Sequence, residues 1–511
     1  MMNRIATHLR RLGAVALVGV LAFVLTSCDG FLDINEDPNA ATRESVTNPG
    51  LVFIEAQTAL ASNKVMEIIG QSSIAQTWSA INPTFTPAEN YNQSTFTTGN
   101  TYLGNYTTTA GNLTEVIAIA EGANPDAVPY SPDNVIAQAE LFRQYTYLYI
   151  TSQFGPMAYS QANKFDEFPE PELDPQEEVL RGIIANADSA LNRLNTDGAR
   201  GIEDRDLFFE GDLSKWEKFG NSLKLRAYVL LLSGEGGTLG ADGALGGTIR
   251  SELEALLQEP MIRSNADNAL FPFSDGAGNE NNFFQLSDDF GGGENLWFAC
   301  STTLVDELGD LNDPRLSTYC QEDINGGFTG VPQGETGTFI DNPEIGNVEE
   351  SVISDNIHRP GYPEKFLTAS EVLLKEAEVL FRLGETGAAY DKFVAGVEAS
   401  MDFFDGRPGD IDGSAKETYI ENELPDEGSL TLRDIHLQQW IDLFERNPET
   451  WTHWRRTKVP ELTPPASASL ESVQRRYQYP PDAVTANPNV SQQDPAAPMF
   501  FEGPDFFDGT N

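Results

Sequence analysis

Cys28 offers the most distinctive chemistry near the start of this sequence. It follows Leu25-Thr26-Ser27, a branched apolar residue and two small ones, which is the pattern that precedes an acylated cysteine in bacterial lipoproteins. The thiol also lies just beyond the apolar run 12–25, so we expect Cys28 to carry a lipid that anchors the chain to a membrane. The alternative is an ordinary cleaved signal peptide followed by a chance cysteine.

The other two cysteines, Cys300 and Cys320, would both belong to an exported chain. In an oxidising compartment they can form a disulfide, and the alternative is two free buried thiols. The chain has only four histidines, and they are scattered. Such a composition leaves little material for a zinc, haem or iron–sulfur site, so we expect no metal and no cofactor.

Aromatic rings interspersed with amides suggest a second kind of chemistry. Flat aromatic faces and amide hydrogen bonds suit neutral sugars. The densest such mixture contains Trp78, Asn82, Phe85, Tyr91, Asn92, Phe96 and Tyr102, and Trp297 follows a run of three glycines. The predicted ligand-binding residues are Trp78, Asn82, Tyr91, Phe96, Tyr102 and Trp297. The alternative is that these aromatic residues pack loops onto a scaffold, because most aromatic side chains in proteins are largely buried.

Acidic residues indicate no catalytic site here. With 78 Asp and Glu residues, pairs of carboxylates arise by chance, and the sequence has neither a G-x-S-x-G nor an H-E-x-x-H motif. The acids at 402–412 match a calcium-binding loop only in part, because Pro408 and Tyr419 occupy positions that need acids. We expect a solvated acidic loop and no catalytic residues.

Basic residues cluster near the C-terminal end, at 455–458 and 475–476. These clusters could bind an acidic ligand, or they could pair with the chain's own surplus carboxylates. The second interpretation is favoured, because arginine forms two-pronged pairs with carboxylates.

Length and charge exclude several classes of protein. The chain has 511 residues, 40% of them hydrophobic, which is enough to build a core. Its net charge of −46 repels phosphate backbones, so nucleic-acid binding is excluded. Removal of a signal peptide, residues 1–27, would take away three arginines and make the net charge −49. The ratio of acids to bases resembles adaptation to high salt, and no later segment is apolar for long enough to span a membrane.

Helical patterns supply the scaffold that must position any site. Start signals and apolar periodicity agree at Ser131-Pro132-Asp133, Asp174-Pro175-Gln176-Glu177, Ser214-Lys215-Trp216-Glu217 and Thr368-Ala369-Ser370-Glu371. The last of these helices should end at Leu383-Gly384, and a second should begin almost at once. This arrangement is a partial tetratricopeptide pattern and predicts a helical hairpin. Since strand-type alternation is sparse, the fold class is mainly α, with large irregular loops that are suited to binding.

Short segments in a shared order resemble the SusD/RagB family of outer-membrane lipoproteins, and within it the SusD-like branch. They are spread over about 450 residues. They are CDGFLDINEDPN at 28–39, FGPMAYS at 154–160, DPQEE at 174–178, WEKFGNSLKLR at 216–226, DPRL at 313–316, AEVL at 377–380, WTHWRR at 451–456 and RRYQYP at 475–480.

The resemblance implies an α-helical fold with tetratricopeptide-like hairpins, on the outer face of the outer membrane. It implies binding of a nutrient, an oligosaccharide more than a peptide, and delivery to a partner SusC-type, TonB-dependent β-barrel. We expect a signal peptide at 1–27, an N-terminal tether at 28–50 and one SusD-like domain at 51–511. Two alternatives stay open: a secreted lipoprotein glycoside hydrolase, and a helical scaffold that holds other surface proteins.

Overall fold

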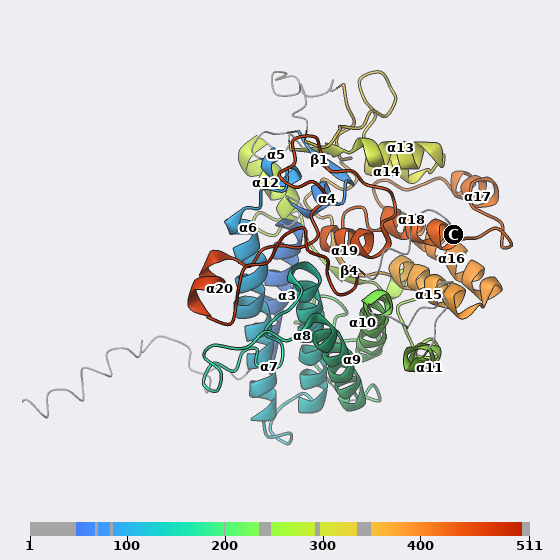
Figure 1. Cartoon of the computed structure of the whole chain (residues 1–511). Helices are drawn as coiled ribbons and strands as arrows, with labels where there is room; N and C mark the ends of the chain where they lie inside the picture. The colour runs from blue at the N-terminus through green and yellow to red at the C-terminus, as the bar shows by residue number, and fades with distance from the viewer. Residues whose placement is uncertain are drawn as a thin grey trace, which may run out of the picture. The chain divides into compact units, whose positions relative to one another are not determined.

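Helices make up most of the chain, and neighbouring helices in the sequence pack against one another (Figure 1). The computed structural model describes residues 48–66, 70–81, 85–198, 200–234, 247–291, 297–334 and 349–502. The predicted mainly α fold is confirmed. The chain from Pro49 onward clusters into a single unit. Cys28 and the predicted signal peptide lie outside the described residues.

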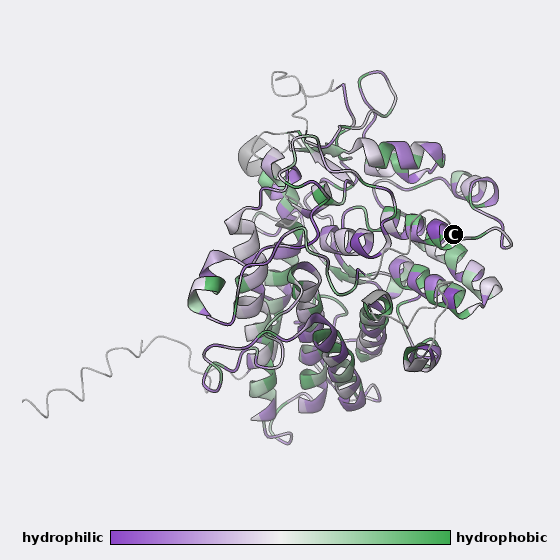
Figure 2. Ribbon diagram, viewed as in Figure 1, coloured by the Kyte–Doolittle hydropathy of each residue, from purple (hydrophilic) through white to green (hydrophobic). Residues whose placement is uncertain are grey.

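The N-terminal half is a set of long helices around a shared apolar core. Helix α3 (Pro49–Met66) packs against α7 (Gly111–Glu121), and α8 (Pro132–Phe154) lies between α7 and α9 (Gln176–Arg193). Helix α10 (Leu213–Gly234) then packs on both α8 and α9. Helix α6 (Thr95–Gly99) continues through a π-helical segment, η4 (Asn100–Ala110), into α7. Figure 2 shows hydrophilic and hydrophobic residues interleaved along these helices, as amphipathic packing requires.

The predicted hairpin is formed by α15 (Ala369–Leu383) and α16 (Thr386–Asp402). Gly384 ends α15 with a φ of +85°, a left-handed conformation that glycine adopts without a Cβ clash. At the helix crossing, a Cβ on Gly396 would lie 2.7 Å from Leu374 Cγ, so glycine lets the two helices approach closely. Helices α18 (Leu432–Asp442) and α19 (Asn447–Thr457) follow, and α18 packs on α15 and α19.

Four short strands form two separate antiparallel pairs among the described residues. Strand β1 (Trp78–Ala80) pairs with β3 (Phe298–Cys300), with Trp78 opposite Cys300. Strand β2 (Ala269–Phe271) pairs with β4 (Glu364–Leu367). The first pairing joins segments about 220 residues apart, so it brings the two aromatic regions singled out in the sequence to one place.

Short helices and irregular segments complete the described chain. These are α4 (Gln71–Ile74), α5 (Thr86–Glu89), α11 (Gly247–Leu256), η5 (Asn265–Asp267), α12 (Asn282–Gly291), α13 (Thr302–Asp310), α14 (Arg315–Tyr319), α17 (Gly413–Asn422) and α20 (Pro481–Ala486). Every helix in the described ranges is too short or too polar to cross a bilayer.

Two of the predicted helix starts are confirmed in detail, and two are shifted. Ser131 Oγ accepts from Asn134 N at 3.4 Å, and Thr368 Oγ1 accepts from Glu371 N at 3.3 Å. The predicted cap at Ser214 is wrong, because Asp212 accepts from Ser214 N at 2.9 Å and α10 has already begun at Leu213. Asp174 does not cap α9 either; its carboxylate accepts from the backbone N–H of Tyr159 at 2.9 Å.

Candidate functional site

A groove lies where the segment from α4 to α6 meets a C-terminal segment, residues 474–477. It encloses about 480 Å³, part of which is open solvent. We call it the loop groove. Its lining residues are Gly70, Ile74, Phe85, Pro87, Ala88, Asn92, Gln93, Ser94, Thr97, Thr98, Gln474 and Tyr477.

None of these twelve lining residues carries a charge, in a chain with 78 acids and 32 bases. They present amides, hydroxyls, small apolar groups and two aromatic rings. Such a lining can bind a neutral, hydroxyl-rich molecule through hydrogen bonds and contact with an aromatic face. The uncharged lining therefore contrasts with the strongly acidic composition of the chain as a whole.

Tyr91 directs the chain along the groove. Its backbone has a φ of +61°, a left-handed conformation that is uncommon for a residue with a Cβ. The side chain is only 5% exposed and belongs to the main apolar core, so its burial holds this turn in place. Asn92, which follows, is exposed on the groove lining, and Gln93 and Ser94 extend the lining toward α6.

Gln93 connects the two sides of the groove. Its Nε2 donates to the carbonyl oxygen of Arg476 at 3.2 Å, and its Oε1 accepts from Gln478 N at 2.9 Å. On the opposite side, Gln474 Nε2 donates to the same Arg476 carbonyl at 2.9 Å. Gln474 is fully buried, and its Oε1 has no hydrogen-bond partner among the described residues. A ligand hydroxyl that donates to this oxygen would satisfy it.

Close packing shapes one end of the groove. A Cβ on Gly70 would lie 2.7 Å from Tyr477 Oη, so only glycine allows the chain to pass this ring. The Tyr477 ring also packs on Trp451 at 5.1 Å between centroids, and Tyr477 N donates to Gln153 O at 3.0 Å. The C-terminal segment is thus fixed to α19 and α8.

A buried carboxyl group, Glu89, lies next to the groove residue Ala88 and is mainly uncharged at neutral pH. Glu89, at the end of α5, is 0% exposed and accepts from Ala80 N at 2.5 Å and Gly334 N at 2.9 Å. Burial raises the pKa of Glu89 to about 8, so the group is mainly protonated at neutral pH. Glu89 therefore links α5 to β1, through Ala80, and to the segment that contains Gly334.

Three of the sequence-predicted aromatic residues are buried and cannot present a face to a ligand in this structure. Trp78 is 0% exposed and contacts the rings of Phe283 and Phe444 at 5.0 and 5.7 Å. Tyr91 and Tyr102 lie in the main apolar core. For these three residues the structure matches the alternative, in which aromatic residues pack loops onto the scaffold.

The remaining predicted residues lie nearer to the groove or cannot be described. Trp297 is half-buried, and its ring meets Phe85, a groove residue, at 5.3 Å between centroids. Phe96 belongs to α6, but its side chain is not described, and Asn82 lies outside the described residues. Gln93, Gln474 and Tyr477 were not among the predicted ligand contacts, and the basic residues at 475–476 were predicted to be part of the architecture. No local pattern marks them, because they become neighbours only through the tertiary fold.

The basic clusters near the C-terminus are structural. Arg455 is fully buried, donates to Ser152 O at 2.6 Å and Arg475 O at 2.8 Å, and lies 3.7 Å from the centroid of Trp451. Arg475 donates to Glu502 Oε2 at 2.6 Å. Arg456, Lys458 and Arg475 pair with carboxylates, as the favoured interpretation predicted. Arg455 and Arg476 depart from it, because they donate to backbone carbonyl oxygens.

Other candidate sites have simple structural roles. Cys300 and Cys320 form a disulfide. In the acidic segment 402–412, Lys416 Nζ lies 2.8 Å from Asp402 Oδ1 and also pairs with Asp405. The described residues contain no group of three or more His, Cys, Asp or Glu side chains placed to bind a metal ion.

Comparisons with known proteins agree with this architecture. Three solved structures superpose over most of the chain. A chitin-binding protein is 21% identical, with a TM-score of 0.72, covering 89% of this chain and 100% of its own. A SusD/RagB family protein from Bacteroides thetaiotaomicron is 20% identical, with a TM-score of 0.71, covering 89% and 99%. A SusD homologue from Bacteroides uniformis is 19% identical, with a TM-score of 0.69, covering 88% and 99%.

None of the curated proteins compared with the chain matches it significantly. The structural likenesses, all at low identity, establish the SusD-like fold. A family model described as "Starch-binding associating with outer membrane" matches residues 38–480, which is most of the sequence. The chain therefore belongs to this SusD-like family.

Proposed function

We propose that this protein is a surface lipoprotein that binds a neutral oligosaccharide in the loop groove and delivers it to a partner SusC-type, TonB-dependent β-barrel. It would be anchored through Cys28 and would carry out no covalent chemistry. The observation that carries the proposal is the groove lining: twelve uncharged residues in a chain of net charge −46. A negatively charged ligand would be repelled by a chain of this net charge, whereas a neutral sugar would not.

The family description and the chitin-binding relative support a carbohydrate as the ligand. The geometry adds how such a ligand would be held. Asn92 and Ser94 lie at the open side, Phe85 offers a ring that Trp297 supports, and Gln474 offers a buried acceptor. Several weak contacts spread over one groove suit the capture of an oligomer that must later be released.

Binding can be tested with the purified exported chain on an array of neutral, sulfated and uronic-acid oligosaccharides, together with peptides. We expect binding to neutral oligosaccharides. Asn92→Ala should weaken the affinity for these oligosaccharides about five-fold, because one hydrogen bond to the ligand would be lost. Asn92 is exposed, so its replacement should leave the melting temperature unchanged. The matched control is Asn422→Ala, an exposed asparagine at the end of α17.

Four outcomes would overturn parts of the proposal. Binding only to peptides or to charged glycans would contradict the ligand, and unchanged affinity in Asn92→Ala would contradict the groove. Cleavage products that disappear on a single Asp or Glu substitution would favour a glycoside hydrolase. Affinity purification from outer membranes separates the remaining alternative, because co-isolation of soluble proteins without a large β-barrel would favour a scaffold.

A further inference from the structure

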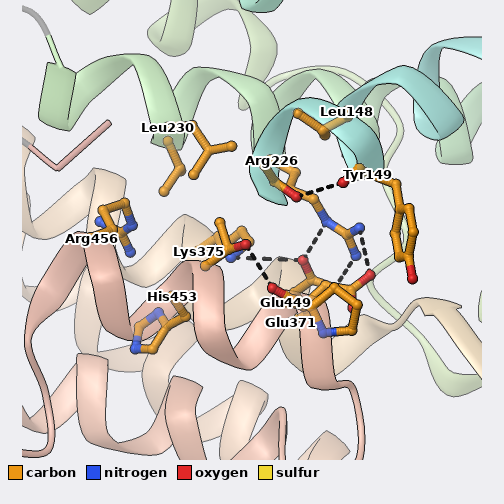
Figure 3. Close-up of a pocket in the computed structure, with 13 residues that line it drawn as sticks. Leu148, Tyr149, Arg226, Leu230, Glu371, Lys375, Glu449, His453 and Arg456 are labelled. Carbon is orange, nitrogen blue, oxygen red and sulfur yellow. Dashed lines mark hydrogen bonds and ion pairs between the residues drawn. The ribbon is translucent and has the colours of Figure 1, made fainter. Parts of the chain in front are cut away.

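A second cavity lies inside the helical scaffold, away from the loop groove, and its walls are charged (Figure 3). Residues of α8, α10, α15 and α19 line it. Its lining residues are Leu148, Tyr149, Ser152, Arg226, Val229, Leu230, Glu371, Lys375, Pro448, Glu449, Thr452, His453 and Arg456. Most of these residues are less than one-tenth exposed. A cavity with such polar walls is not expected to be dry.

The ionic network around this cavity has more cations than acids. Ion pairs connect the charged lining residues with partners on α3, α15, α18 and β4 and with Arg446, which precedes α19. The six cations are Lys64, Arg226, Lys375, Arg382, Arg446 and Arg456, and the five acids are Glu364, Glu371, Glu378, Asp442 and Glu449.

One of these acids is mainly neutral at pH 7, because burial raises the pKa of Glu364 to about 8. The histidines next to the network, His436 and His453, are also neutral, since burial lowers the pKa of both. The network therefore carries a net positive charge inside a chain whose total is −46. Buried charge of one sign is costly unless a counter-charge lies nearby.

Lys375 is the cation that lacks a strong partner. Its ammonium group makes no hydrogen bond within the described part of the chain, and it lies 3.7 Å from Glu371 Oε1. That carboxylate is already engaged, because Arg226 donates to both of its oxygens at 2.7 Å and Arg446 donates to Oε2 at 2.6 Å. In the view of Figure 3, Lys375 lies between this group and the pair His453 and Arg456. An ammonium group has three donors to satisfy.

We propose that this cavity binds a small monovalent anion, of halide size, against the Lys375 ammonium group. The anion would accept hydrogen bonds from Nζ and would offset the excess positive charge of the network. His453 donates through Nε2 to His436 O at 2.9 Å, and its Nδ1 has no partner among the described residues. A water molecule that donates to both Nδ1 and the anion would complete the site. The Glu371 and Glu449 carboxylates in the wall disfavour dianions such as sulfate.

The site is tested with bromide, which is detected by its anomalous scattering. Crystals of the exported chain grown in sodium bromide should show an anomalous peak within hydrogen-bonding distance of Lys375 Nζ. In solution, sodium bromide should raise the melting temperature in a saturable manner, by about 2 °C, relative to sodium methanesulfonate at the same ionic strength. Lys375→Met should abolish both signals.

The matched control is Lys392→Met on α16, which removes the same charge from a residue that pairs with Glu376 at 2.7 Å outside the cavity. This variant should retain the bromide response. A bromide response that survives in Lys375→Met, or no saturable response in the native protein, would overturn the proposal. If Lys375→Met does not fold, the bromide map of the native protein decides, and density for water alone at Nζ would refute the site. None of these results depends on glycan binding.

Discussion

Arg456 and Glu378 form a two-pronged ion pair inside the helical scaffold. Nη1 lies 2.5 Å from Oε1 and Nη2 lies 2.7 Å from Oε2, and both side chains are at most 2% exposed. Arg456 belongs to the segment WTHWRR and Glu378 to the segment AEVL. Two of the short segments that carried the family resemblance thus meet as partners that join α19 to α15. Their contribution is to the architecture of the scaffold.

Removing one partner of this buried pair should destabilise the fold strongly. We expect Arg456→Met to lower the free energy of unfolding by about 3 kcal/mol, because Glu378 would lose its two-pronged donor while remaining buried. The exposed pair of Arg181 and Glu177 provides the control, and Arg181→Met should cost less than about 0.5 kcal/mol. Chemical denaturation of the three proteins measures both values. Equal effects of the two substitutions would contradict a structural role for Arg456.

The disulfide between Cys300 and Cys320 closes a loop with a sequence separation of 20 residues. The free energy of unfolding of a double Cys300→Ser, Cys320→Ser variant should be lower by about 3 kcal/mol. Without the crosslink, the unfolded chain has a higher conformational entropy. Reductant should lower the melting temperature of the native protein towards that of the variant and leave the variant itself unchanged. If reductant leaves the melting temperature of the native protein unchanged, the disulfide does not stabilise the fold.

Local patterns were sufficient to predict the scaffold. The hairpin of α15 and α16 was predicted because Thr368 caps one helix, Gly384 ends it, and the apolar spacing between them is helical. The predicted cap at Asp174 was wrong for a tertiary reason, because its carboxylate accepts from the backbone N–H groups of Tyr159 and Ser160 instead. The predicted cap at Ser214 was wrong for a local reason, because Asp212, two residues earlier, accepts from the N–H groups of Ser214 and Lys215.

The loop groove was predictable only in part. The interval 78–102, which was predicted to contribute ligand contacts because it is rich in aromatic and amide groups, supplies much of the groove lining. Which rings would face inward was not predictable, since Trp78 is buried by β3 and Phe444, segments more than 200 residues away in sequence. Tyr477 is held at the groove by Gln153, more than 300 residues earlier, and Gln474 by Trp451, 23 residues earlier, and nothing near them in the sequence indicates these contacts.

His358 should make the protein less stable as the pH falls. It is 3% exposed and packs against the rings of Phe283 and Phe284, and burial lowers its pKa from 6.5 to about 4. Below pH 6.5 the unfolded chain therefore binds a proton at His358 that the folded chain does not bind. The free energy of unfolding falls as the pH decreases from about 6.5 to about 4. The loss should approach about 3 kcal/mol, at 1.36 kcal/mol for each pKa unit.

The measurement compares the native protein with His358→Gln, which cannot titrate. The difference in their free energies of unfolding should be constant above pH 7 and should shrink as the pH falls below 6.5. Comparison with the variant cancels the titration of other groups, including His436 and His453. Parallel curves between pH 7 and pH 4 would contradict the assignment.

Glu89 should act in the opposite direction. Burial raises its pKa to about 8, so the folded chain retains a proton that the unfolded chain releases above pH 4.5. Stability from this group is therefore lost as the pH rises from 4.5 through 8. Relative to Glu89→Gln, the native protein should lose about 1 kcal/mol per pH unit in this interval. A pH-independent difference between the two proteins would show that Glu89 is ionised when folded.

The acidic surface should make the protein more stable in salt. Buried residues in the described chain include eleven acids and eight lysines and arginines, so burial removes only a small part of the charge of −46. The remaining acids repel one another, and the screening length falls from about 10 Å at 0.1 M salt to about 3 Å at 1 M. We expect the melting temperature to rise over this range with the sodium salts of several monovalent anions. Lys375→Met must retain this rise, because it removes the proposed internal anion site while changing the net charge by only one. A melting temperature that stays constant or falls would show that self-repulsion does not limit the fold, and the acidity would then need another explanation.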